Sequence, residues 1–142
     1  MSKLANLSDE WSSKQKFKGN FFMPHTDIKY TADLEFDIKA LMLGIEKIIL
    51  DLDPTSGVCK SRAIKIEQYY HSHINIELRM YATKERDMVL VNQLITRVDQ
   101  QTKSLMKSAA HVTVKLDFTP LPYLTGFFDP SNLTYSWENR TL

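Results

Sequence analysis

The residues of this chain that could do chemistry begin with Met23-Pro24-His25, which opens a predicted strand over residues 24–31. Inside a chain, a proline at the first residue of a strand is ordinary, because its fixed φ and missing N–H are tolerated there. If Met23 were the initiator and were removed, the ring nitrogen of Pro24 would instead be a free amine. A chain-terminal amine titrates at about 7.7–8.0, whereas an amide nitrogen is not a base. Pro24 is therefore a candidate catalytic base.

Other reactive side chains do not complete a recognisable site. His71 and His73 form a His-x-His pair, which on a strand points both rings to one side. Two ligands are too few for a metal site, so we expect surface or interface histidines and no metal. The single cysteine, Cys59, cannot form an internal disulfide and lacks a recognisable nucleophile signature. We expect Cys59 to be a packing or loop residue.

Hydrophobic spacing predicts six elements that must position Pro24. The predicted strands cover residues 24–31, 63–70, 74–80 and 112–118, and the predicted helices cover residues 38–52 and about 83–109. Asp53-Pro54 ends the first helix, because a proline disfavours helix at the residue before it. Thr83 is the expected N-cap of the second helix.

The order of these elements is strand-helix-strand, twice. Each helix then connects two parallel strands by a right-handed crossover. We expect an α/β (α+β) domain over residues 23–142, in which one four-stranded sheet carries both helices on a single face. The other face would be bare in a monomer, and an irregular aromatic tail follows from about residue 119. Both features predict an oligomer, because exposed apolar surface of this kind is usually covered.

Composition argues against several classes of function. The formal net charge of the 142 residues is +1, which gives no reason to expect a nucleic acid or an acidic membrane as a partner. No strand carries the aromatic-basic signature of a β-α-β nucleic-acid module. No apolar run approaches the roughly 20 residues that span a bilayer, and residues 1–22 lack the apolar middle of a signal peptide. We expect a cytoplasmic protein.

Met23-Pro24-His25 at the head of two β-α-β units, with Ser61-Arg62 opening the second strand, resembles the tautomerase superfamily. Within it, the length from Met23 onward looks most like the 5-carboxymethyl-2-hydroxymuconate isomerases, and the likeness covers roughly residues 23–125. The resemblance implies a homotrimer that breaks down aromatic compounds. Its amino-terminal proline would move a proton between carbons of a dienol or unsaturated oxo acid, without metal or cofactor.

The resemblance also implies cations around the proline, and four residues stand where its pattern asks for them: Lys60, Arg62, Lys84 and Arg86. Such cations would disfavour the charged form of the amine, hold the carboxylate of a small dicarboxylate or oxo-acid substrate, and stabilise the developing enolate. The family pattern leads us to expect arginines at both places, so Lys60 and Lys84 depart from it. Lysine offers a point charge in place of a planar, two-pronged contact.

Residues 1–22 precede this domain as a polar extension, and the mechanism fails if they stay attached, because Pro24 is then an amide. Lys18-Gly19 can be encoded by AAAGGA, a ribosome-binding sequence, at a bacterial spacing from Met23. Our hypothesis is that the chain has been read from an upstream start. The alternative is a non-enzymatic trimeric relative with a blocked proline, acting as a binding or scaffold protein. The plainer interpretations are a strand-start proline and a solvated basic face.

Overall fold

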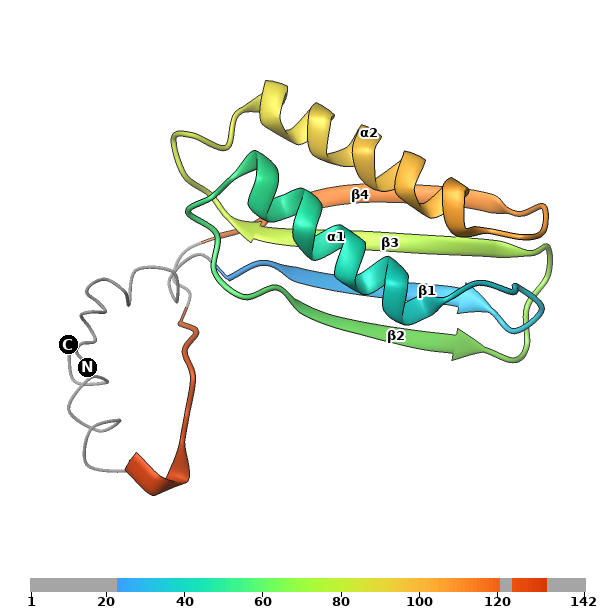
Figure 1. Cartoon of the computed structure of the whole chain (residues 1–142), viewed down its shortest axis with the longest axis horizontal. Helices are drawn as coiled ribbons and strands as arrows, with labels where there is room; N and C mark the ends of the chain where they lie inside the picture. Colours follow the sequence, from blue (N-terminus) through green and yellow to red (C-terminus); the bar gives the residue numbers. More distant parts are fainter. Residues whose placement is uncertain (1–22, 121–123, 133–142) are drawn as a thin grey trace.

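The computed structural model describes residues 23–120 and 124–132 (Figure 1). The predicted extension over residues 1–22 and much of the aromatic tail lie outside the described residues. The elements in chain order are β1 (His25–Thr31), α1 (Ile38–Leu52), β2 (Lys60–Ile66), β3 (His73–Tyr81), α2 (Met88–Leu105), β4 (His111–Thr119) and a short 3-10 helix, η2 (Pro130–Asn132). The predicted β-α-β-β-α-β order is confirmed.

The four strands form one mixed sheet in the order β2-β1-β3-β4. β1 pairs with β2 in parallel and β3 pairs with β4 in parallel, while the two central strands, β1 and β3, are antiparallel. Both helices cover the same face of the sheet, as predicted (Figure 1). The starts of β1 and β2 therefore meet the ends of β3 and β4 at one end of the sheet, on the left in Figure 1.

Helix α1 has the bounds that its apolar spacing predicts. Its N-cap is Asp37, whose carboxylate accepts a hydrogen bond from the Ala40 amide at 3.0 Å, and its C-cap is Asp53. The buried stripe that faces the sheet consists of Leu41, Ile45, Ile48 and Ile49. The stripe is buried because i, i+4, i+7 and i+8 share one side of a helix.

Helix α2 is shorter than predicted at both ends. The expected N-cap, Thr83, lies in the preceding loop, where its carbonyl accepts a hydrogen bond from the Arg86 amide at 3.2 Å. The cap is Asp87, whose carboxylate accepts from the Leu90 amide at 3.0 Å. Both residue types cap helices well, so the sequence did not decide between them. The helix ends at Leu105, four residues before the predicted end.

The core lies between the helices and one face of the sheet. Every second residue of β3 is buried there, namely Ile74, Ile76, Leu78 and Met80. The edge strand β2 differs from its prediction, because it pairs with β1 from Lys60 to Ile66 and does not extend to residue 70. On this strand Ile64 is on the uncovered face and 51% exposed, while Ala63 packs against the core.

Candidate active site at the head of β1

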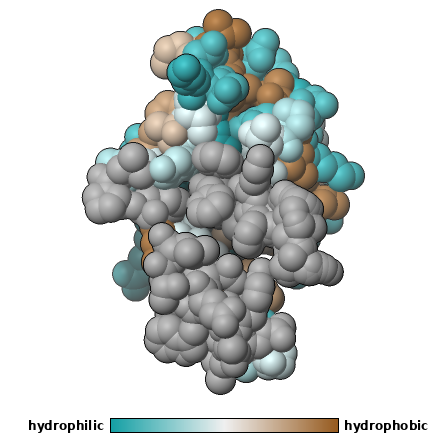
Figure 2. Space-filling model, turned by 90° about the vertical axis from the view of Figure 1, so that its left-hand side faces the viewer, coloured by the Kyte–Doolittle hydropathy of each residue, from teal (hydrophilic) through white to brown (hydrophobic). Residues whose placement is uncertain are grey.

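Pro24 lies immediately before β1, at the end of the sheet where β2 begins. Its carbonyl accepts a hydrogen bond from the Lys60 amide at 3.0 Å, which fixes the register between the two strands. Pro24 is buried, and Met23 before it is 6% exposed. Figure 2 views this end of the domain, where hydrophilic and hydrophobic patches of the described residues lie side by side. The strand pairing thus places the candidate base beside the first predicted cation.

Strand register gathers charged side chains on the face of the sheet that the helices leave uncovered. Paired residues of neighbouring strands share a face, so Lys60, His25 and Arg79 form one row across β2, β1 and β3. The next row on this face contains Arg62, Asp27 and Glu77.

Two of the four predicted cations, Lys60 and Arg62, therefore stand on this face, paired with the first and third residues after Pro24.

Asp27 joins two of the cations in this group. The Arg62 guanidinium donates two hydrogen bonds to the Asp27 carboxylate, from Nε to Oδ1 at 2.5 Å and from Nη2 to Oδ2 at 3.3 Å. Arg79 Nη1 lies 3.8 Å from Oδ2 of the same carboxylate. The hydrogen bond from Arg62 lowers the pKa of Asp27 and outweighs the opposing effect of burial. Asp27 therefore stays ionised between two guanidinium groups.

His25 is the residue that directly follows the candidate base. Burial and the neighbouring Lys60 ammonium both lower the pKa of His25, and together they outweigh the opposite influence of Asp27. The imidazole is therefore neutral at pH 7 and adds no positive charge to the group.

The chain beyond β4 reaches the same place. Lys60 Nζ donates a hydrogen bond to Thr125 Oγ1 at 3.0 Å, which joins residues 65 positions apart. Thr125 belongs to the aromatic tail that was predicted to lie in an oligomer interface. The segment contributes at least one polar contact to this end of the sheet.

The other two predicted cations lie in the loop between β3 and α2. Lys84 is exposed there, at the same end of the sheet as Pro24. Arg86 is 4% exposed, and its guanidinium donates to Asp53 Oδ2 at 2.6 Å, to the Tyr81 carbonyl at 2.5 Å and to Ser56 Oγ at 3.0 Å. A substrate carboxylate could contact this guanidinium only after displacing Asp53. The structure therefore brings Lys60 and Arg62 together and keeps Arg86 in a different, buried cluster.

The carboxylate of Asp53 is the centre of that buried cluster. Burial alone would raise its pKa, but hydrogen bonds from Thr55 and Arg86 and the guanidinium charge outweigh it, so the pKa lies below its usual value. The cluster connects the end of α1 to the loop that leads into α2. Its arrangement is that of a structural ion pair.

Sequence reasoning missed Asp27 and Arg79. Both look like ordinary polar positions of alternating strands. The pairing of β1 with β2 brings Asp27 beside Arg62, and the pairing of β1 with β3 brings Arg79 beside His25. The available signal was the strict alternation of β3, which already assigned Arg79 to the face opposite the core. The register that places it beside β1 could not be derived from spacing.

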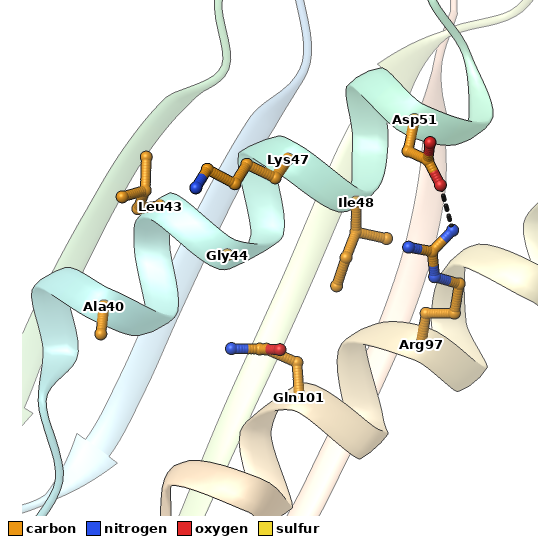
Figure 3. A pocket seen from close by; sticks show the side chains of 8 residues that line it. All are labelled: Ala40, Leu43, Gly44, Lys47, Ile48, Asp51, Arg97 and Gln101. Carbon is orange, nitrogen blue, oxygen red and sulfur yellow. Dashed lines mark hydrogen bonds and ion pairs between the residues drawn. The ribbon is translucent and has the colours of Figure 1, made fainter.

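A separate groove of about 590 Å³ lies between the two helices, on the opposite side of the sheet from the charged face (Figure 3). Gln101 of α2 points toward Gly44 of α1, and Arg97 bonds to Asp51 at 2.7 Å across the groove. Its lining mixes apolar residues with polar ones, and the polar members are Lys47, Asp51, Arg97 and Gln101. This groove contains none of the sequence-predicted site residues.

Of the remaining reactive residues, Cys59 directly precedes Lys60, but its side chain packs with the core. Cys59 is a buried free thiol that shares a hydrogen bond with Thr26 Oγ1 at 3.3 Å, and burial raises its pKa. His71 and His73 lie at the β2–β3 connection, where β1 ends.

Within residues 23–120 and 124–132, no three His, Cys, Asp or Glu side chains are grouped so that they could hold a metal ion. No helix in the described part of the chain has the length and apolarity needed to cross a membrane.

No protein-family model matches the chain, and no curated protein matches it. Solved structures do. A 5-carboxymethyl-2-hydroxymuconate isomerase from Deinococcus radiodurans R1 is 16% identical with a TM-score of 0.56, covering 84% of this chain and 97% of its own. A fused 4-OT, described as a wild-type symmetric trimer, is 12% identical with a TM-score of 0.56, covering 71% and 94%. Pt0534, in a structure inactivated by 2-oxo-3-pentynoate, is 14% identical with a TM-score of 0.50, covering 68% and 86%.

At these identities the likeness concerns the fold. The matched structures span most of the described domain and nearly all of their own chains, and they include an isomerase of the kind that the Met-Pro-His motif resembles. The chain therefore has the tautomerase fold, as its resemblance to the tautomerase superfamily implied.

Proposed function

We propose that this protein is a cofactor-independent isomerase or tautomerase of unsaturated oxo or hydroxymuconate-type acids, with the amine of an amino-terminal Pro24 as its general base. The observation that carries the proposal is the position of Pro24, buried at the head of β1 beside Lys60 and on the same sheet end as Arg62. The working chain then begins at Pro24. The isomerase among the structures of the same fold supports the reaction class, and the cytoplasm and the breakdown of aromatic compounds are the proposed setting.

The chemistry assigns one role to each side chain. The unprotonated Pro24 amine takes a proton from a carbon or enol oxygen of the substrate and returns it to another carbon, so the net change is an isomerisation. Burial and the nearby Lys60 and Arg62 disfavour the ammonium form and keep the amine available near pH 7. Lys60 and Lys84 hold the substrate carboxylate and stabilise the enolate as charge develops on oxygen, while Arg62, paired with Asp27, adds positive charge to the same face. Arg86 is not included, since its guanidinium is bonded to Asp53.

Three chains test the base. One begins at Pro24, the second carries a single alanine ahead of Pro24, and the third is the full 142 residues. We expect enol–keto conversion of a phenylpyruvate-type substrate only in the first. The inserted alanine is the matched control, because it turns the ring amine into an amide and changes little else. Equal activity in all three chains would refute the proline base. Activity in none would favour the non-enzymatic trimeric relative, a binding or scaffold protein.

A covalent probe gives an independent readout. A free proline amine adds to the alkyne of 2-oxo-3-pentynoate and its proton passes to carbon, so the adduct carries the mass of both reactants. We expect peptide mass spectrometry to find the adduct on Pro24 in the chain that begins there. An adduct on a lysine in that chain, or equal labelling after the alanine insertion, would contradict the assignment. Mass spectrometry of the native amino terminus decides whether the cell makes this chain.

We propose further that the protein is a homotrimer. The charged face of the sheet is uncovered in one chain, and the fused 4-OT of the same fold is described as a symmetric trimer. Light scattering on the full chain of 142 residues should then give three times its mass of 16.5 kDa. A monomer at micromolar concentration would exclude this part of the proposal and leave the base untouched.

A further inference from the structure

Asp27 is an anion at the place where a substrate anion is expected to bind. Its two carboxylate oxygens accept from Nε and Nη2 of Arg62, which is the two-pronged edge that a guanidinium offers to a carboxylate ligand. We propose that Asp27 occupies the carboxylate-binding edge of Arg62 and makes this site select ligands with one carboxylate over ligands with two. The turnover part of this inference rests on the proposed function, and the binding part does not.

The partners of the three neighbouring cations support this selection. Arg62 is bonded to Asp27, and Arg79 lies 3.5 Å from Glu77 and 3.8 Å from Asp27. Lys60 differs, since the contact that the structure gives its ammonium is to the neutral hydroxyl of Thr125. Two carboxylates therefore offset the two guanidinium charges of these rows, and Lys60 is the cation in them whose charge is left for a substrate carboxylate, which Lys84 approaches from the neighbouring loop.

A second carboxylate would have to replace Asp27 on Arg62. Asp27 is held in place by its strand and stays ionised, so the incoming group competes with an intramolecular partner. The side chain of Arg62 is 73% exposed, so water screens the pair and the selectivity is modest. Asp27 is thus a specificity-determining residue that acts through Arg62 rather than by contact with the reacting atoms.

The test uses two ligands that differ only at one end. Trans,trans-muconate is a six-carbon diene with two carboxylates, and sorbate is the same diene with a methyl group in place of one of them. Binding to the full chain is measured by calorimetry and by NMR of the arginine Nε–H groups. The wild-type protein is expected to bind sorbate at least as tightly as muconate.

Asp27→Asn is the informative variant, and Glu77→Gln is its matched control. Each removes one negative charge from the same face, but Glu77 contacts Arg79 and Lys115 and not Arg62. We expect Asp27→Asn to raise the preference for muconate over sorbate about fivefold, the upper range for an exposed ion pair, and Glu77→Gln to raise it less than about twofold. In Asp27→Asn, muconate should shift the Nε–H signal of Arg62, and adding Arg62→Gln should abolish the gain.

Two results would overturn the inference: equal effects of the two variants, or a gain that survives Arg62→Gln. Asp27→Ala repeats the test without the asparagine amide, and its NMR spectrum reports whether the fold is kept. Failure of the proposed function would look different. In that case the ligand preference would change as expected, while no chain beginning at Pro24 would convert an enol substrate.

Discussion

Replacing Arg86 with methionine tests the assignment of the buried cluster most directly. The substitution keeps an unbranched apolar stem but removes a guanidinium whose side chain is 0% exposed, and it leaves Asp53, whose side chain is 7% exposed, without its cation. Removing one partner of a buried pair costs about 3–5 kcal/mol, because the remaining charge is uncompensated. The total stability of a domain is only about 5–15 kcal/mol, so the variant should be close to unfolding.

Urea unfolding, followed by circular dichroism, measures this cost. For a slope of about 1–3 kcal/mol per molar urea, the midpoint should fall by roughly 2 M. Arg97→Met is the control, since Arg97 also pairs with an aspartate of α1, but the two side chains are 41% and 65% exposed. That variant should cost no more than about 1 kcal/mol. Asp53→Asn combined with Arg86→Met should recover part of the loss, because no isolated charge remains.

Similar costs for Arg86→Met and Arg97→Met would refute the reasoning. So would a folded Arg86→Met chain, cut to begin at Pro24, whose KM for a carboxylate substrate rises while its stability is unchanged. That pattern would return Arg86 to the substrate-binding residues.

Three further predictions concern single sites. Cys59, 8% exposed and with its pKa raised by burial, should react with a maleimide at pH 8 only after unfolding, so rapid labelling of the native chain would contradict its position. A Cβ at Gly44 would lie 2.9 Å from Gln101 Nε2 (Figure 3). In Gly44→Ala this close contact should offset the gain in helix propensity, so the free energy of unfolding should hardly change. Gly44→Ala combined with Gln101→Ala should raise the free energy of unfolding by up to about 1 kcal/mol. NMR titration should find the pKa of His25 below 6.5. Because this pKa is depressed, protonation of His25 destabilises the folded chain as the pH falls. Lys60→Ala should raise the pKa of His25 toward its ordinary value.

Most helices and strands were predictable because their apolar residues recur at the spacing that burial of one face requires. The alternation of β3 and the stripe of α1 follow from a sheet covered on one face. Strand β2 was predicted less well, since an edge strand buries little: the predicted bounds were residues 63–70, whereas the strand runs from Lys60 to Ile66. Whether Thr83 or Asp87 caps helix α2 depends on the path of the loop before it, and N-cap preferences do not indicate that path.

The candidate site was only partly predictable. Pro24, Lys60 and Arg62 could be named from short motifs and their order. Asp27 depends on a register between strands that are separated by a helix, and no local pattern encodes that register. The pairing of Arg86 was hidden for a similar reason, because Asp53 had already been interpreted as the end of a helix.

The two β-α-β units have matching backbone contacts at their first residues. The amide of Lys60 donates to the carbonyl of Pro24, and the amide of His111 donates in the same way to the carbonyl of Ser72, both at 3.0 Å. Ser72 is therefore the twin of Pro24 at the opposite end of the sheet, but it lies mid-chain and its nitrogen is always an amide. A polypeptide has a single amino terminus, so under the proposed mechanism only the first β-α-β unit can supply the base. An assembly that works in this way would have one reactive amine for each chain, and therefore one for every two β-α-β units.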